Sequence, residues 1–136
     1  MPISVTSLDH LVITCSDLDR TAAFYQRLGM SLQTFGDHPS QRRQALTFGP
    51  GTQKINLHQV GKEFDPHADK PTPGSQDLCF VVEMPIEEVC EQLESEGIAI
   101  ELGPVDREGA RGKMRSVYVR DPDRNLVELA SYGKAA

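Results

Sequence analysis

Tryptophan is absent from this 136-residue chain, aromatic residues make up only 6% of it, and no apolar run of about 18 residues occurs. A membrane-spanning segment is therefore not expected. The net charge of −6, with Lys and Arg spread thinly, argues against a nucleic acid or an anionic membrane surface as the main partner. The amino-terminal sequence has no basic leader typical of a signal peptide, so we expect a cytoplasmic protein.

Cysteine is also scarce. Cys15, Cys79 and Cys90 are widely spaced and form no CxxC pair, which predicts reduced, mostly buried thiols, with a catalytic cysteine as a minority interpretation. The glycine patterns of dinucleotide-binding and P-loop proteins are missing, as are GxSxG and HExxH. Most familiar short catalytic motifs are thus excluded.

What the chain does contain is a repeated order of elements. Alternation and β-branched residues predict strands, and a 3.6-residue apolar stripe followed by glycine predicts each helix. In the first half we expect a helix at Leu18–Leu28, with Ser16 as its N-cap and Asp19 at the reciprocal capping position. The strands expected there are Leu8–Thr14, Met30–Phe35, Gln44–Phe48 and Lys54–Val60.

The proline-rich segment Gly61–Ser75 predicts a linker, after which the order restarts. The expected elements are the strand Asp77–Val82, the helix Met84–Glu96, and the strands Ile98–Leu102, Ser116–Arg120 and Leu126–Ser131, with a loop at Gly103–Lys113. The chain is therefore βαβββ twice: one α+β domain made of module 1 (about 6–60), the linker 61–75 and module 2 (about 76–132). Two such modules are expected to pack together, because one alone leaves a sheet face uncovered.

The stretch Arg115–Tyr132 holds the clearest functional candidate. Pro122 favours a turn between two strands, in which Asp121, Asp123 and Asn125 can bond local backbone amides. In the second strand Glu128 lies mid-strand between Val127 and Leu129. A carboxylate there is costly in a dry core, so either its face is solvated or Glu128 has a partner.

Laying the two halves over one another brings further polar residues to equivalent strand positions. The first strands offer His10 and Asp77, and the last strands offer Asn56 and Glu128, with His58 two residues after Asn56. Imidazole and carboxylate ligands suit a divalent transition metal. Each residue also has a purely structural interpretation, such as a hydrogen-bonded His10, a capping Asp77 or a solvent-facing His58.

The predicted loop also contains a basic group, Arg107, Arg111, Lys113 and Arg115, together with two glycines. Two interpretations stand: a mobile basic lid over an anionic substrate, or a solvated loop that balances an acidic protein. His38 and His67 lie in polar loops and are expected to be exposed.

At this point the sequence resembles the vicinal oxygen chelate superfamily, the glyoxalase, bleomycin-resistance and ring-cleaving dioxygenase group. The motifs that carry the resemblance are LDHLVITCSDLDRTAAFYQRLGM at 8–30, KINLHQV at 54–60 and YVRDPDRNLVELASY at 118–132. The stretch INLHQVGKEFDPHADKPTPGSQDLCFV is similar to the branch called glyoxalase domain-containing protein 5, with its bacterial virulence-associated relatives.

The resemblance implies two tandem βαβββ modules that form a cupped, partly open mixed sheet around one divalent metal ion, Zn, Ni, Mn or Fe. By position, His10 and Glu128 match the family's ligands, and Asp77 stands where histidine is common. The fourth position falls on Asn56, a poor ligand, so His58 is expected to replace it, unless the register makes His58 a substrate-binding group. Glu128 is the expected catalytic base. Asn56, Arg111, Lys113 and Arg115 are weaker candidates for binding substrate.

The function expected from the resemblance is a metal-dependent lyase or isomerase of the glyoxalase I type. Its substrate would be a small carbonyl compound or thiohemiacetal, possibly linked to glutathione. The alternatives are a dioxygenase, a thiol-transferring resistance enzyme, or a metal-free protein that sequesters an antibiotic or metabolite. A homodimer is expected, because a linker of about 15 residues could reach across an interface and most oligomers have two-fold symmetry.

Overall fold

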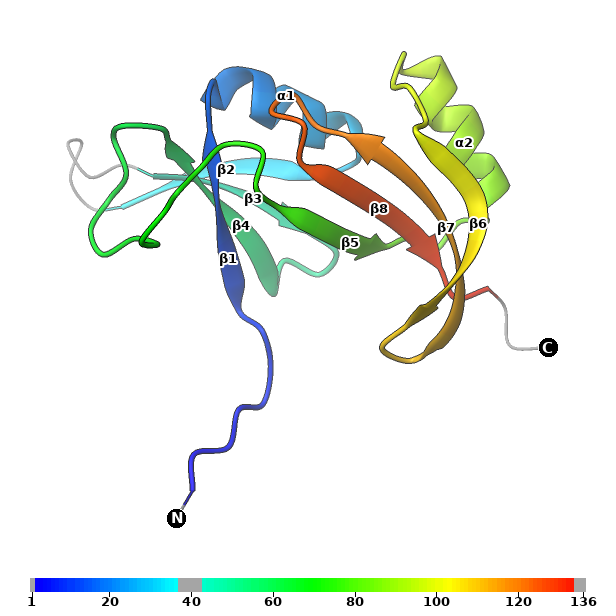
Figure 1. The fold of residues 1–136 in the computed structure, drawn as a ribbon, viewed down its shortest axis with the longest axis horizontal. Coiled ribbons are helices and arrows are strands. Elements are labelled where there is room, and N and C mark those ends of the chain that lie inside the picture. The colour runs from blue at the N-terminus through cyan, green and yellow to red at the C-terminus, as the bar shows by residue number, and fades with distance from the viewer. Residues whose placement is uncertain (1, 37–42, 134–136) are drawn as a thin grey trace. The chain divides into compact units, whose positions relative to one another are not determined.

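The protein is an α+β chain of two tandem modules, seen here in a computed structural model that describes residues 2–36 and 43–133 (Figure 1). It forms two compact units, Met1–Pro73 and Gly74–Ala136. In the first unit the elements are β1 (His10–Cys15), α1 (Leu18–Arg27), β2 (Ser31–Phe35), β3 (Arg43–Phe48) and β4 (Gln53–Gln59). In the second they are β5 (Asp77–Val81), α2 (Ile86–Ser95), β6 (Leu102–Gly109), β7 (Gly112–Arg120) and β8 (Leu126–Ser131).

Module 1 is a four-stranded mixed sheet in the order β1-β4-β3-β2, with β1 and β4 parallel and the other pairs antiparallel. Helix α1 contacts β2, β3 and β4 and buries Ala22, Phe24 and Tyr25. The sheet positions that alternate toward this helix are apolar and buried: Ile13, Leu46, Ile55 and Leu57. The opposite face is polar, and it carries the residues of functional interest.

Module 2 repeats this plan with the order β5-β8-β7-β6, in which β5 and β8 are parallel. Helix α2 contacts β7 and β8 and buries Ile86, Val89 and Leu93. The alternating apolar side chains of β7 and β8 are buried on the same face of the sheet, which explains the alternation that predicted these strands. These side chains are Val117, Val119, Val127 and Leu129.

Two sequence-based expectations were wrong in module 2. The predicted loop Gly103–Lys113 belongs to the β6–β7 hairpin, and no strand forms at Ile98–Leu102, because β6 begins only at Leu102. The hairpin was not predicted because its charged residues and glycines interrupt the apolar alternation that indicates a strand. A Cβ at Gly109 would overlap the Tyr132 hydroxyl and approach the Met114 sulfur to 2.7 Å, so a larger residue there would force these two side chains to shift.

The N-cap of α1 also differs from the expectation. Asp17, not Ser16, has the extended backbone of an N-cap, and its carboxylate accepts a hydrogen bond from the Arg20 N–H at 3.2 Å. The cap therefore lies one residue later than predicted. Ser16 instead accepts a bond at its carbonyl from the Gln59 side chain, at 2.7 Å. This bond joins the start of α1 to the end of β4.

The turn between β7 and β8 confirms the expectation for Asp121. The buried carboxylate of Asp121 accepts bonds from the N–H groups of Asp123 and Asn125 at 3.0 and 2.9 Å, and from the Asn125 side chain at 2.8 Å. Asn125 in turn accepts the Gln76 N–H at 2.8 Å. This network ties the turn to the start of β5 and sets the register of β8, and with it the face on which Glu128 lies.

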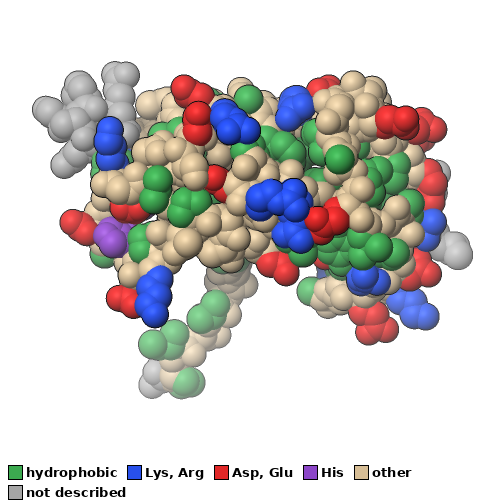
Figure 2. All heavy atoms as spheres, turned by 45° about the horizontal axis from the view of Figure 1, so that its top comes forward, with side chains coloured by type: hydrophobic (Ala, Val, Ile, Leu, Met, Phe, Trp, Pro, Cys, Tyr) green, Lys and Arg blue, Asp and Glu red, His purple; other side chains and the backbone are tan. Residues whose placement is uncertain are grey.

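The remaining expectations concern surface and loops. No helix in the described part of the chain is long and apolar enough to cross a membrane. On the face shown in Figure 2, acidic and basic side chains are interspersed. Cys15 is buried, but Cys90 is only partly buried and Cys79 is exposed, so burial of the thiols is incomplete. His67 is exposed as expected, and His38 lies outside the described residues.

Candidate functional site

The polar face of module 1 is defined by the parallel pairing of β1 with β4. His10 pairs with Lys54, Val12 with Asn56, and Thr14 with His58. Paired side chains share a face, so His10, Asn56 and His58 all lie on the side opposite α1. Asn56 is two residues beyond the partner of His10, about 7 Å along the strand, whereas His58 is four residues beyond it, about 13 Å. The register thus brings His10 closer to Asn56 than to His58.

His10 is oriented by its neighbour. Its Nδ1 lies 2.7 Å from a carboxylate oxygen of Asp9, and its side chain is 42% exposed. A carboxylate on one ring nitrogen fixes the imidazole and leaves Nε2 as the second nitrogen. This is the usual arrangement of a histidine that ligates a metal through Nε2.

Asn56 and His58 are buried, with 7% and 5% of their surfaces exposed. Within the described part of the chain, Asn56 Oδ1 and His58 Nδ1 have no hydrogen-bond partner. Buried polar atoms are normally paired, because losing water without a replacement costs roughly 1–3 kcal/mol. An unpaired carbonyl oxygen suits a cation or a donor, so both atoms are candidates for contact with a bound group.

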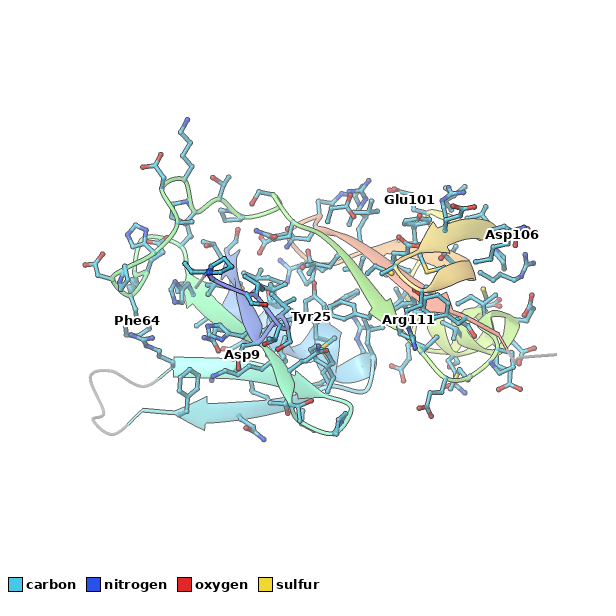
Figure 3. All side chains as sticks on the ribbon, turned by 90° about the horizontal axis from the view of Figure 1, so that it is seen from below. Asp9, Tyr25, Phe64, Glu101, Asp106 and Arg111 are labelled. Atoms are coloured by element: carbon cyan, nitrogen blue, oxygen red, sulfur yellow. The ribbon has the colours of Figure 1, made fainter. Side chains whose placement is uncertain are left out.

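His58 sits in a cluster formed with the segment that follows β4. Phe64, labelled in Figure 3 on this segment, stands edge-on to the His58 ring at 5.6 Å between centroids. The Arg43 guanidinium lies 4.5 Å above the same phenyl ring. Burial of the imidazole, and then the charge of Arg43, lower the pKa of His58, while the nearby Glu63 carboxylate opposes them. The net effect favours the neutral form of the His58 imidazole.

Module 2 presents a matching polar face. Asp77 pairs with Leu126 and Cys79 with Glu128, so Glu128 lies two residues beyond the partner of Asp77. His10 and Asn56 stand in the same relation in module 1. The register therefore makes Asn56, and not His58, the counterpart of Glu128.

Glu128 has a partner. The buried Ser116 hydroxyl, on the neighbouring strand β7, donates to Glu128 Oε2 at 2.6 Å. The exposure of Glu128 itself is intermediate. Of the two interpretations that the sequence left open, the structure supports a partnered carboxylate, with Oε1 as its second oxygen.

Cys79 lies beside this carboxylate. The residue is exposed at its surface, yet partial burial of its sulfur, followed by the charges of Glu128 and Asp77, raises the pKa of its thiol to about 11. The thiol is thus protonated at neutral pH. This argues against Cys79 as a nucleophile, because the thiolate is the reactive form.

The basic residues of the β6–β7 hairpin are placed differently from Glu128. Lys113 and Arg115 alternate to the opposite face of β7 from Ser116, and Arg115 pairs with Glu87 of α2 at 2.8 Å and Asp106 at 3.4 Å. Arg111 stacks on the Tyr132 ring at 4.3 Å. Figure 3 shows Arg111 and Asp106 in this hairpin region. The segment with these basic residues is thus part of a hairpin, in which Arg115 has two carboxylate partners.

Within residues 2–36 and 43–133, no three His, Cys, Asp or Glu side chains come together in a group that could hold a metal ion. Sequence reasoning missed Ser116 and Arg43. The only signal for Ser116 was its place as a small polar residue in a valine-rich strand, and Arg43 precedes the strand that was predicted to begin at Gln44.

The chain was also compared with known proteins. The model of the Glyoxalase/Bleomycin resistance protein/Dioxygenase superfamily matches residues 7–129. The glyoxalase domain-containing protein RDO1 of Mycosarcoma maydis is 58% identical over 133 residues, which are 98% of this chain and 72% of that protein. Virulence protein STM3117 of Salmonella typhimurium is 50% identical over 129 residues, 94% of this chain and 85% of that protein. Its crystal structure superposes with a TM-score of 0.89, at 48% identity, covering 96% of this chain and all of that one.

More distant solved structures share the fold. The lactoylglutathione lyase of Agrobacterium tumefaciens is 22% identical, with a TM-score of 0.66, 94% of this chain and 95% of that one covered. The antibiotic-binding protein TnmS3 from Streptomyces is 18% identical, with a TM-score of 0.74 and coverage of 96% and 98%. These likenesses concern the fold alone.

Proposed function

Because this chain belongs to the glyoxalase/bleomycin resistance protein/dioxygenase superfamily, we propose that it is a divalent-metal-dependent lyase or isomerase acting on a small carbonyl or thiohemiacetal substrate. The observation that carries this proposal is Glu128. It is a mid-strand carboxylate that Ser116 holds at 2.6 Å, on the polar face of module 2.

The donor atoms fit a metal ion. His10 has its ring oriented by Asp9, Asn56 has a buried carbonyl oxygen without a partner among the described residues, and Asp77 and Glu128 add carboxylates at matching register positions. We propose these four as the ligands, in place of the expected His58. One imidazole with three oxygen donors favours Mn²⁺ over Zn²⁺ and Ni²⁺, which prefer more nitrogen ligands.

A divalent ion bound there would stabilise negative charge that develops on two neighbouring substrate oxygens. The chain itself supplies the proton transfer. Glu128 takes the proton from the carbon beside a carbonyl group and returns it to the adjacent carbon, so the reaction is an isomerisation that needs no external oxidant. Ser116, through its bond to Oε2, keeps the carboxylate turned so that Oε1 can act as the base.

The test is metal-dependent turnover, in a screen that begins with methylglyoxal plus glutathione. Glu128→Gln removes the base and is expected to lower kcat at least about 100-fold, the usual scale of a general base. Ser116→Ala keeps the carboxylate but removes the hydrogen bond that orients it, so kcat is expected to fall about 10-fold. Glu91→Gln, on the exposed side of α2, is the matched control and should be unchanged. Full activity in Glu128→Gln would remove the assignment of the base.

A second candidate function is metal-free binding of a small molecule. It is favoured by the amide of Asn56 and by Asp77, which leave His10 as the only imidazole among the four positions. The fold neighbour TnmS3 is described as an antibiotic-binding protein. Purified chain that takes up no stoichiometric Mn²⁺, Zn²⁺, Ni²⁺ or Fe²⁺ but still binds small molecules would favour this function over catalysis.

A further inference from the structure

The polar face of module 1 carries a second group of residues beside the proposed ligands. Phe35 pairs with Arg43, Gln44 pairs with Leu57, and His58 pairs with Thr14, which sets Phe35, Arg43 and His58 level with one another across β2, β3 and β4. Side chains at level positions of neighbouring strands project from the same face. The three residues therefore form one row.

Two cations converge on this row. The Arg43 guanidinium stacks on Phe64 at 4.5 Å, and Phe64 also contacts His58. The Lys54 ammonium reaches across the same face to the Phe35 ring, at 3.9 Å. Aromatic faces hold a cation in place, for about 0.5–2 kcal/mol, but they do not neutralise its charge.

No carboxylate forms an ion pair with Arg43 or Lys54 anywhere in residues 2–36 and 43–133. The Glu63 carboxylate acts on His58 through its charge, but it already accepts a hydrogen bond from the Gly61 N–H at 2.9 Å. Both cations are half-buried. This contrasts with the hairpin of module 2, where Arg115 has two carboxylate partners.

The buried ring of His58 indicates what kind of group would bind beside these cations. It is 95% buried, and its Nδ1 has no hydrogen-bond partner among the described residues. An imidazole nitrogen that carries a proton can donate it to an anionic oxygen. Among the described residues, two cations without a carboxylate partner and one ring nitrogen without a hydrogen-bond partner lie on this face beside two phenyl rings. This combination matches an anionic oxygen group attached to a small apolar body.

We propose that Arg43, Lys54 and His58 form a binding site for an anionic group of the substrate, a carboxylate or a phosphate. The proposal rests on the proposed function in one respect, that this face of module 1 receives substrate. It assigns the substrate as an anionic carbonyl compound, and it gives His58 a binding role instead of the role of metal ligand.

The experiment is a two-dimensional ¹H–¹⁵N NMR titration of chain freed of metal with a chelator. The probes are succinate and, separately, inorganic phosphate, with ionic strength held constant by NaCl. We expect saturable shifts at Arg43, Lys54 and His58 with a dissociation constant in the millimolar range. Arg43→Met and Lys54→Met should each weaken binding about 10-fold, and Glu63→Gln should tighten it. The spectrum of each variant shows at the same time whether it is folded.

Arg27→Met is the matched control. Arg27 also lies over a phenyl ring, that of Phe24, at 5.8 Å, but on α1 and thus on the other side of the sheet. Its removal should leave anion binding unchanged. Absence of saturable shifts, or equal binding by Arg43→Met and wild type, would overturn the proposal.

The metal is measured separately, so the two proposals fail independently. Chain that binds Mn²⁺ but neither anion retains the metal proposal and loses the anion site. Chain that binds the anions but no metal does the reverse.

Discussion

Arg124 is the one described residue other than glycine with a positive φ, 72°, and it sits at the turn that leads into β8. This left-handed backbone costs an ordinary residue roughly 1–2 kcal/mol, whereas glycine adopts it freely. The Arg124 side chain recovers little, since it is exposed and its contact with Glu101 is 3.6 Å long. The turn that sets the register of Glu128 is therefore strained at one residue.

Arg124→Gly should raise the free energy of unfolding by up to about 1 kcal/mol, because relief of strain exceeds the added freedom of the unfolded chain. Arg124→Ala, which keeps the strain and loses the side chain, is the control and should give no gain. Urea unfolding of the three proteins measures the difference. A glycine variant no more stable than the alanine variant would mean that the turn is not strained.

At the scale of elements, the alternating and amphipathic segments were predictable. The strands β1, β5 and β8 and both helices lie within a few residues of the expected bounds, because their apolar faces pack on a core. The hairpin β6–β7 was not predictable from its charged sequence. Its pairing depends on partners distant in the chain, such as Tyr132, whose hydroxyl fits against Gly109.

The candidate site shows the same division. The positions of His10, Asp77 and Glu128 followed from the repeat, and the expectation that Glu128 faces a partner or solvent was resolved by one bond from Ser116. Whether Asn56 or His58 is the fourth candidate ligand depends on strand register, which cannot be read from a single sequence. The same holds for Arg43, which becomes a neighbour of His58 only through the pairing of β3 with β4.

The segment before β6 is joined to β7 by a charged pair. Arg120 donates to both carboxylate oxygens of Glu101, at 3.0 and 2.8 Å, and this hydrogen bonding lowers the pKa of Glu101 below 4.5. A carboxyl group whose pKa is lower in the folded state stabilises the fold above its unfolded pKa. That contribution is lost as the pH falls through the folded pKa.

Arg120→Gln should therefore lower Tm most above pH 4.5, and the gap to wild type should narrow as the solution is acidified below that value. The control is the same substitution in a Glu101→Gln background, where the titrating group is gone and the gap should not vary with pH in this range. Thermal unfolding by circular dichroism at pH 3 to 7 measures it. If the difference in Tm between Arg120→Gln and wild type does not change with pH, the Arg120–Glu101 pair does not contribute to stability in this way.

At the scale of the whole molecule, the chain has two modules of the same plan, each with one pair of candidate ligands. We propose that both pairs contribute to one metal site, within one chain or between two. We predict a homodimer, because two-fold symmetric dimers are the commonest homo-oligomers. Size-exclusion chromatography with light scattering should give twice the mass of one chain, and the mass of a single chain would remove this prediction.

We propose that the two pairs of side chains, His10 with Asn56 and Asp77 with Glu128, bind one divalent ion. The most direct test of this proposal is equilibrium binding of Mn²⁺ to metal-stripped protein, followed by calorimetry. We expect one ion per chain, with binding weakened at least about 10-fold in His10→Ala, Asn56→Ala and Glu128→Gln, and retained in His58→Gln. Binding that is absent, or that survives Glu128→Gln and is lost in His58→Gln, would contradict it.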